Sequence, residues 1–174
     1  EGFEGGSINF NSNKKNKVTN AELKIDDFRL KKLPVFVKIL TLASLNGIAD
    51  LLSGDGIKFD ELDMKFNTKK KVTNIEELYA IGPDISLLLD GYVDGDRLVS
   101  LKGTLVPAAE INKLISAIPV IGDLLVGKKP GEGIFGVSFK VKGPPKDLKT
   151  TVNPIKTLTP RFITRTLEKI KKTN

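Results

Sequence analysis

Short segments in which apolar and polar residues alternate make up most of this chain. The clearest cases run from 99 to 105 and from 137 to 141, where every second residue is apolar apart from Gly103. Because successive side chains of a strand point to opposite faces, this pattern predicts strands with one buried face and one face in water. Clusters of Gly, Asn, Asp and Lys separate these segments and predict turns. We expect strands within residues 7–30, 57–105 and 134–153.

In three places the alternation slips by one residue at a pair of acidic residues. These places are Ile25–Phe28, Phe59–Leu62 and Ile75–Leu78. A change of phase without a turn residue predicts a β-bulge, which bends and twists a strand locally. The segments 17–23 and 71–78 are also similar to each other, and a structural repeat of this kind would predict a sheet extended hairpin by hairpin, with end strands that need cover.

Residues 34–53 interrupt the strand pattern and predict a helix of about five turns, with Pro34 at its first position and Gly54 after its end. Its length approaches the roughly 20 residues of a membrane span. Lys38 and Asp50 interrupt the apolar sequence, however, and a central charge costs about 2.5–3.5 kcal/mol on insertion, so we do not expect it to span a membrane. Two placements stay open: the helix packs on the sheet and closes its end, or a second apolar face contacts lipid.

A second interruption covers residues 107–126. Ile111, Leu114 and Ile118 fall on one face of an amphipathic helix that Pro119 ends. A very apolar helical turn follows and is bordered by lysines, so it either joins the core or enters a bilayer with the lysines at the head groups. The candidate membrane-docking residues here are Val120, Ile121, Leu124, Leu125, Lys128 and Lys129.

Residues 160–172 predict a third helix with a narrow apolar stripe and a basic stripe. The basic stripe consists of Arg161, Arg165, Lys169 and Lys172. A basic amphipathic helix is typical of a membrane surface, of an acidic protein partner or simply of a solvated face. These alternatives stay open, and the four basic residues are further membrane-docking candidates.

The composition removes much of the usual catalytic chemistry, because the 174 residues include no Cys, His or Trp. Imidazole bases, thiolate nucleophiles, disulfides and Cys/His metal sites are therefore excluded. The acids of 90–96 lack the Glu that a calcium loop requires, and Asp94–Gly95 instead predicts a hairpin turn within 93–98. The glycines of 131–136 lead into a strand, unlike those of a dinucleotide-binding loop. We expect no enzyme, no metal site and no cofactor.

Basic residues outnumber acidic ones by 28 to 21, and their distribution is uneven. Residues 1–127 hold 16 basic and 18 acidic residues (net −2), whereas residues 128–174 hold 12 and 3 (net +9). Such a segment favours an acidic partner, either an anionic membrane or nucleic acid. Nucleic-acid binding also needs aromatic residues among the basic ones. This segment has three Phe and no Tyr or Trp, so we do not expect nucleic acid as the partner.

The Gly-rich residues 1–6 carry no basic or apolar segment of a secretory signal. They lead directly into the strand pattern that begins at Ser7. We therefore expect a truncated linker here, and a chain that is a fragment of a longer protein.

Several short motifs follow one another along residues 20–165. They are Leu30–Pro34, Ile39–Ile48, Asp50–Ile57, Ala80–Pro83, Leu101–Pro107, Ile118–Gly127, Gly133–Val137, Val141–Pro145 and Val152–Pro154. In their order and spacing the chain resembles the C-terminal region of large AsmA-like proteins of the Gram-negative envelope, the YhdP and TamB superfamily. The resemblance implies one α+β domain over residues 1–174: a predominantly antiparallel, strongly curved, groove-like sheet with two or three amphipathic or apolar helices covering its end.

The same resemblance implies a function. Members are anchored in the inner membrane, cross the periplasm as a long sheet with an apolar groove, and are implicated in phospholipid movement to the outer membrane. This chain would be a periplasmic segment near the outer membrane, with phospholipids, the membrane surface and other envelope proteins as partners. The candidate groove residues are Val99, Leu101, Val137, Phe139 and Val141. The competing interpretation is a structural or protein-interaction module of the envelope with a filled core.

Overall fold

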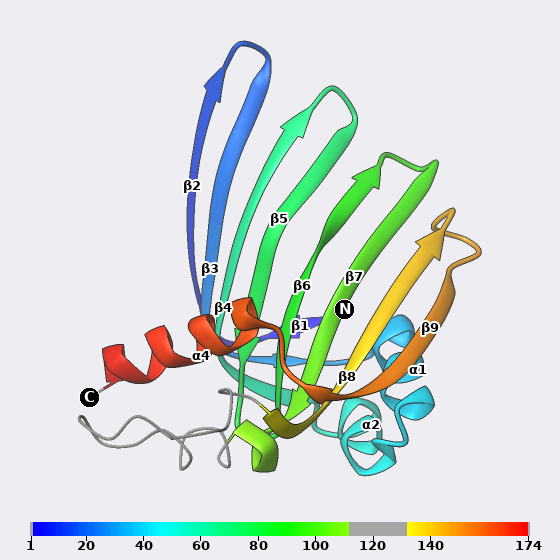
Figure 1. The fold of residues 1–174 in the computed structure, drawn as a ribbon. Coiled ribbons are helices and arrows are strands. Elements are labelled where there is room, and N and C mark those ends of the chain that lie inside the picture. Colours follow the sequence, from blue (N-terminus) through cyan, green and yellow to red (C-terminus); the bar gives the residue numbers. More distant parts are fainter. Residues whose placement is uncertain (1, 112–131, 174) are drawn as a thin grey trace.

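The computed structural model describes residues 2–111 and 132–173 (Figure 1). These residues form an open antiparallel sheet of nine strands with helices at one end, which confirms the predicted α+β class. The strands are β1 (Phe3–Glu4), β2 (Ser7–Lys15), β3 (Val18–Leu30), β4 (Ile57–Lys69), β5 (Val72–Ile81), β6 (Ile85–Asp94), β7 (Leu98–Pro107), β8 (Glu132–Gly143) and β9 (Lys149–Thr157). The helices are α1 (Pro34–Leu42), α2 (Asn46–Ser53) and α4 (Pro160–Thr173), and residues 108–111 are also helical.

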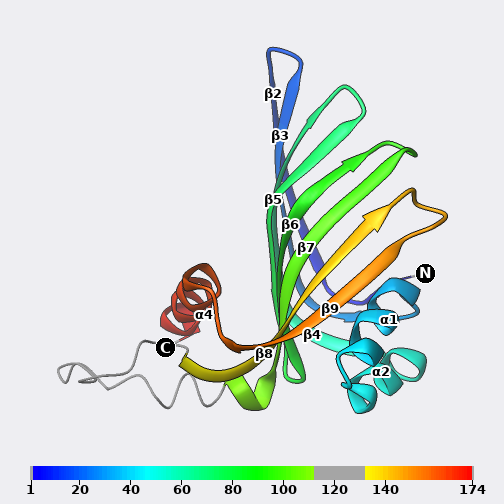
Figure 2. The ribbon, with the colours of Figure 1, turned by 45° about the vertical axis from the view of Figure 1, so that its right-hand side comes forward.

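Each strand from β3 to β8 pairs with the next one in the chain, while β1 and β2 share the outer edge of β3. The hairpins β2–β3, β4–β5, β6–β7 and β8–β9 therefore all turn at one end of the sheet, which we call the hairpin end. The helices α1 and α2 and the turn at 82–84 lie at the opposite end, which we call the helix end (Figures 1 and 2). No helix of the described residues has the length and apolarity that a membrane span requires.

The two faces of the sheet differ in chemistry, because the register aligns like residues across the strands. On one face, which we call the apolar face, two neighbouring rows are almost entirely hydrophobic. The first row is Ile8, Ile25, Leu62, Ala80, Leu87, Leu105 and Val137, and the second is Phe10, Leu23, Met64, Leu78, Leu89, Gly103, Phe139 and Val152. On the other, charged face, Glu22 lies opposite Lys65, Lys24 opposite Asp63, and Asp90 opposite Lys102.

Helices pack on both faces at the helix end (Figure 2). Helix α1 covers the apolar face with Phe36, Ile39 and Leu40, which join the main hydrophobic core. Helix α4 lies on the charged face, where Phe162 and Ile163 form a second cluster with sheet residues that include Tyr79. Each helix thus buries one apolar stripe against the sheet, as amphipathic helices do.

The helix expected over residues 34–53 is two helices. Ser44 adopts a positive φ of 59°, and its N–H bonds the Thr41 carbonyl while the N–H of Leu45 bonds the Leu40 carbonyl. This pattern is a Schellman motif, which ends α1 and lets α2 start at Asn46. A glycine usually occupies the left-handed position of this motif, so a serine there gives little signal in the sequence.

Of the three predicted bulges, one is confirmed and two are wrong. At Glu76–Glu77 the register of β5 shifts against both neighbouring strands. At the other two sites, Asp27 of β3 and Asp60 of β4 both lack a partner in the strand pairing. The β3–β4 register is therefore the same before and after these two residues. Asp27 has a φ of 53°, and the interruption changes the phase of both strands at once without an extra residue on either.

The two similar segments occupy equivalent places in the sheet. Val18 and Val72 both begin a strand after a hairpin turn, and both pair with Lys69 of the strand between them. The predicted hairpin turn of 93–98 is confirmed, with Gly95 at a φ of 48° between β6 and β7.

Candidate functional site

An apolar cavity of about 280 Å³ lies between α1 and the apolar face of the sheet. Val35, Phe36 and Ile39 of α1 form one wall, and Phe28 and Phe59 belong to the wall opposite. Phe3 and Pro34, which also border the cavity, are exposed, so its wall extends to the molecular surface. The cavity is thus a hydrophobic site without polar side chains to orient a ligand.

The local sequence explains both walls. Pro34 fixes the first turn of α1, and the spacing of Phe36, Ile39 and Leu40 puts all three on its buried side. Across the sheet, Gly103 lies opposite Phe139, and a Cβ atom at Gly103 would come 2.5 Å from the Phe139 Cζ. The missing side chain of Gly103 therefore leaves the space that the Phe139 ring occupies.

The apolar face continues beyond α1 toward the hairpin end, where no helix of the described residues covers it (Figure 1). Leu23, Met64 and Leu89 of the second apolar row are only half-buried. At the sheet edge, Ile8 is 69% and Phe10 is 55% exposed. Soluble proteins seldom leave a continuous apolar surface open, and such surfaces mark binding sites.

Three of the predicted groove residues, Leu101, Phe139 and Val141, line this cavity. Val137 is buried in the adjoining core, and Val99 is half-buried closer to the hairpin end, so neither borders the cavity. A helix closing the end of the sheet was predicted, but the predicted groove residues include none from α1 and neither ring of the pair Phe28–Phe59, whose centroids are 5.4 Å apart. In the sequence, Phe28 and Leu30 alternate with Arg29 directly after Asp27, and this alternation was the pattern that could have indicated the ring pair.

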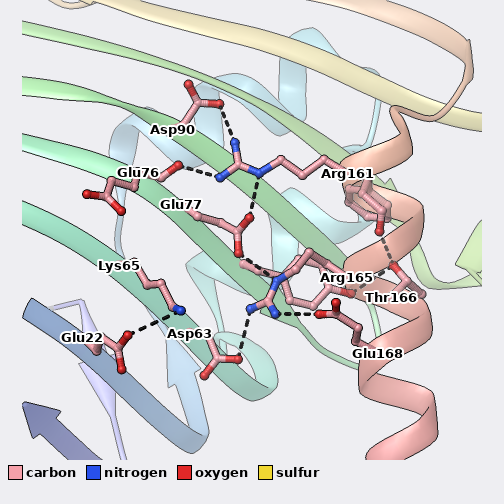
Figure 3. Close-up of polar contacts among 12 residues, drawn as sticks. Glu22, Asp63, Lys65, Glu76, Glu77, Asp90, Arg161, Arg165, Thr166 and Glu168 are labelled. Carbon is pink, nitrogen blue, oxygen red and sulfur yellow. Dashed lines mark hydrogen bonds and ion pairs between the residues drawn. The ribbon is translucent and has the colours of Figure 1, made fainter.

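On the charged face, Arg161 and Arg165 of α4 reach carboxylates of the sheet (Figure 3). The Nε of Arg165 lies 2.8 Å from a Glu77 oxygen, and its Nη2 lies 3.3 Å from Asp63. The Nε of Arg161 lies 2.7 Å from the other Glu77 oxygen, and its Nη2 donates to the carbonyl of Glu76. Glu77 therefore links both arginines and fixes α4 on the sheet.

A tyrosine beneath Arg165 completes this contact. The hydroxyl groups of Tyr79 and Thr166 are 3.1 Å apart, and the Arg165 guanidinium lies 5.4 Å above the Tyr79 ring. Burial raises the pKa of Tyr79, although Thr166 and Arg165 oppose the shift. Burial alone would lower the pKa of Arg165, but Glu168, Glu77 and Asp63 together raise it, so the guanidinium stays charged.

This arrangement corrects the expected membrane-facing stripe of the last helix. Arg161 and Arg165 point to the sheet instead of outward, because α4 buries its apolar side there and brings both arginines over sheet acids. The side chains of Lys169 and Lys172 lie outside the described residues. So do the docking candidates Val120, Ile121, Leu124, Leu125, Lys128 and Lys129.

Fold and site together define a class: an open antiparallel sheet whose apolar face holds a hydrophobic cavity and whose charged face holds a helix. Within the described ranges, no group of acidic side chains could hold a metal ion. Comparisons of the chain with protein families, with curated proteins and with solved structures found no match.

Proposed function

We propose that this chain is a non-enzymatic lipid-handling segment that holds phospholipid acyl chains along the apolar face of its sheet. The observation that carries the proposal is the continuity of the cavity under α1 with the open apolar rows. An acyl chain lying on Leu23, Met64 and Leu89 would remove both its own surface and that of these side chains from water. Each buried methylene contributes about 0.8 kcal/mol. Such binding needs no polar group to orient the ligand, which agrees with the lining of the cavity.

The packing of α1 supports a strongly curved sheet that forms a groove around this ligand. Helix α1 follows β3 at one edge of the sheet but packs against β9 near the other edge. A short helix reaches both edges only if they approach each other on the apolar side. In this arrangement α1 closes one end of the groove, and the hairpin end is open.

The cavity sets a limit on what α1 itself can enclose. Its volume of about 280 Å³ is at the lower end of the roughly 300–1,000 Å³ of small-molecule pockets. We propose that it takes the end of one acyl chain, while the remainder of that chain lies on the open rows and the head group stays in water.

The resemblance to AsmA-like proteins supports the wider setting. We place the segment in the periplasm of a Gram-negative bacterium, within an inner-membrane-anchored protein that moves phospholipid between the two membranes. This end would lie near the outer membrane.

Site-specific photocrosslinking in the bacterial envelope tests the proposal. Benzoylphenylalanine is placed at Leu23 or Leu101 on the apolar face and, as matched controls, at the adjacent Lys24 or Lys102 on the charged face. After irradiation, the purified protein is analysed by mass spectrometry for covalently attached phospholipid. We expect lipid adducts at the two leucine positions and none at the two lysine positions.

The same experiment separates the competing function. Equal lipid yields on both faces, or no lipid at either leucine position, would overturn the proposal. Adducts of Leu23 with another protein, and none with lipid, would instead identify a structural or protein-interaction module.

A further inference from the structure

Exposed lysines border the hairpin end of the sheet. They come from three of its four hairpins: β2–β3 and β4–β5 are neighbours, and β8–β9 is separated from them by the hairpin β6–β7 (Figure 1). We call the following nine residues the lysine rim: Lys14, Lys15, Lys17, Lys69, Lys70, Lys71, Lys142, Lys146 and Lys149.

The charge of the rim is not neutralised within the described part of the chain. No lysine of the rim forms an ion pair with a described acid, and residues 10–21 and 66–75 contain no acidic residue at all. The acids at the hairpin turns are Asp94, Asp96 and Asp147, and Asp94 is already paired with Arg97 at 2.7 Å. The rim therefore projects an excess of positive charge into water.

Several acidic side chains of the sheet lie on its charged face, away from the lysine rim. Asp63, Glu77 and Asp90 face α4, where Arg161 and Arg165 neutralise them. Residues 1–127 sum to −2 although they hold six of the nine rim lysines, because most of their 18 acidic residues lie away from the lysine-bearing turns. The basic surface is thus a product of the topology, which collects the hairpin turns at one end.

The chemistry of the rim favours a lipid surface over nucleic acid. Its cations are lysines, which act as point charges, and the only described arginine near it, Arg97, is paired. Immediately below the rim, Phe66 and Ile75 begin the apolar face. Cations that border an apolar surface are typical of a membrane interface, where the cations contact anionic head groups and the apolar residues contact acyl chains.

We infer that the lysine rim docks on the anionic surface of a bilayer, with acidic glycerophospholipids as its partner. This inference goes beyond the proposed function and does not require lipid on the apolar face. Each lysine close to an anionic surface strengthens binding about fivefold, and the effect falls off within about 10 Å at moderate salt. Lysines on one hairpin therefore act together on the same patch of membrane.

Vesicle flotation of the purified chain tests the inference. Vesicles of phosphatidylcholine with about one-third phosphatidylglycerol are compared with vesicles of phosphatidylcholine alone, at about 50 mM and about 300 mM salt. We expect binding only to the anionic vesicles and weaker binding at the higher salt. Replacing Lys69, Lys70 and Lys71 together by Gln should weaken binding about 100-fold, and the same change at Lys14, Lys15 and Lys17 should act in the same direction.

A matched variant removes the same charge away from the rim. Lys32, Lys38 and Lys156 are exposed lysines toward the helix end, and their replacement by Gln should leave vesicle binding unchanged. Equal losses in the control and the rim variants would overturn the inference, because net charge alone would then explain binding. Unchanged binding in both rim variants would overturn it as well, as would tighter binding to a single-stranded RNA oligomer than to anionic vesicles.

Failure here and failure of the proposed function are distinguishable. Flotation reports contact with a membrane surface, whereas the photocrosslinks at Leu23 and Leu101 report lipid on the apolar face. Circular dichroism of each variant excludes a loss of fold as the cause of lost binding.

Discussion

Replacing Arg165 with Met tests whether the ion pairs between α4 and the sheet stabilise the protein. The Arg165 side chain is 21% exposed and bridges Glu77, which is 15% exposed, and Asp63. The substitution keeps an unbranched stem for packing on Tyr79 but removes the guanidinium, so the half-buried Asp63 loses its cation and Glu77 keeps only Arg161.

The burial of these groups sets the expected cost. Exposed ion pairs contribute about 0–1 kcal/mol, and removing one partner of a fully buried pair costs about 3–5 kcal/mol. Arg165 lies between these limits, so we expect the free energy of unfolding to fall by about 2 kcal/mol. Arg161 is 47% exposed, and Arg161→Met should cost less than about 1 kcal/mol because solvent screens its ion pairs.

Urea unfolding followed by far-ultraviolet circular dichroism measures these costs, since the chain has no Trp for fluorescence. Hydrogen exchange of the α4 amides shows whether the helix opens separately from the sheet. If the cost arises from an unpaired carboxylate, adding Asp63→Asn to Arg165→Met should restore part of the lost stability, because Arg165 is the cation paired with Asp63. The reasoning is refuted if Arg165→Met costs less than Arg161→Met, or if the double variant is less stable than Arg165→Met alone.

Three further predictions follow from burial and backbone geometry. In a Tyr92→Phe variant, Tyr79 is the only tyrosine, and absorbance at alkaline pH should show it ionising above the ordinary pKa of about 10. Because folding raises this pKa, the stabilising contribution should be complete below about pH 10 and decline as pH rises through the folded value, which alkaline urea titrations can measure. Gly103→Ala should cost about 1–3 kcal/mol in the same unfolding assay, because the added Cβ would meet Phe139 and backbone. Gly47→Ala, in open space within α2, should instead stabilise by about 0.5–1 kcal/mol.

The regular parts of the fold could be predicted from the sequence because local patterns determine them. Alternation located the strands, and Asp94–Gly95 located a hairpin turn. The division of residues 34–53 depends on the left-handed conformation of Ser44, a residue that gives no such signal. The paired interruption at Asp27 and Asp60 was equally hidden, since it depends on two strands changing phase together.

The candidate site was only half predictable for a similar reason. Leu101, Phe139 and Val141 were found because they lie on one face of neighbouring strands. The contacts of Arg165 with Asp63 and of Arg161 with Glu77 join residues 102 and 84 positions apart, and no local pattern reports them. The sequence therefore showed a basic stripe on the last helix but not the acids that neutralise it.

The distribution of charge in the fold connects the two proposals. Helix α4 uses Arg161 and Arg165 to neutralise sheet carboxylates, so these two cations are not available to a membrane. The unpaired cations of the described sheet instead border the end at which the apolar rows are open, while α1 closes the other end. A phospholipid could place its acyl chain on Leu23 and Leu89 and its head group toward the lysine rim. It would then cover the apolar surface and bring an anionic group to the lysines at the same time. The alternation of side chains along each strand thus separates two tasks in this proposal: the apolar face would bind lipid, and the charged face holds helix α4 through Arg161 and Arg165.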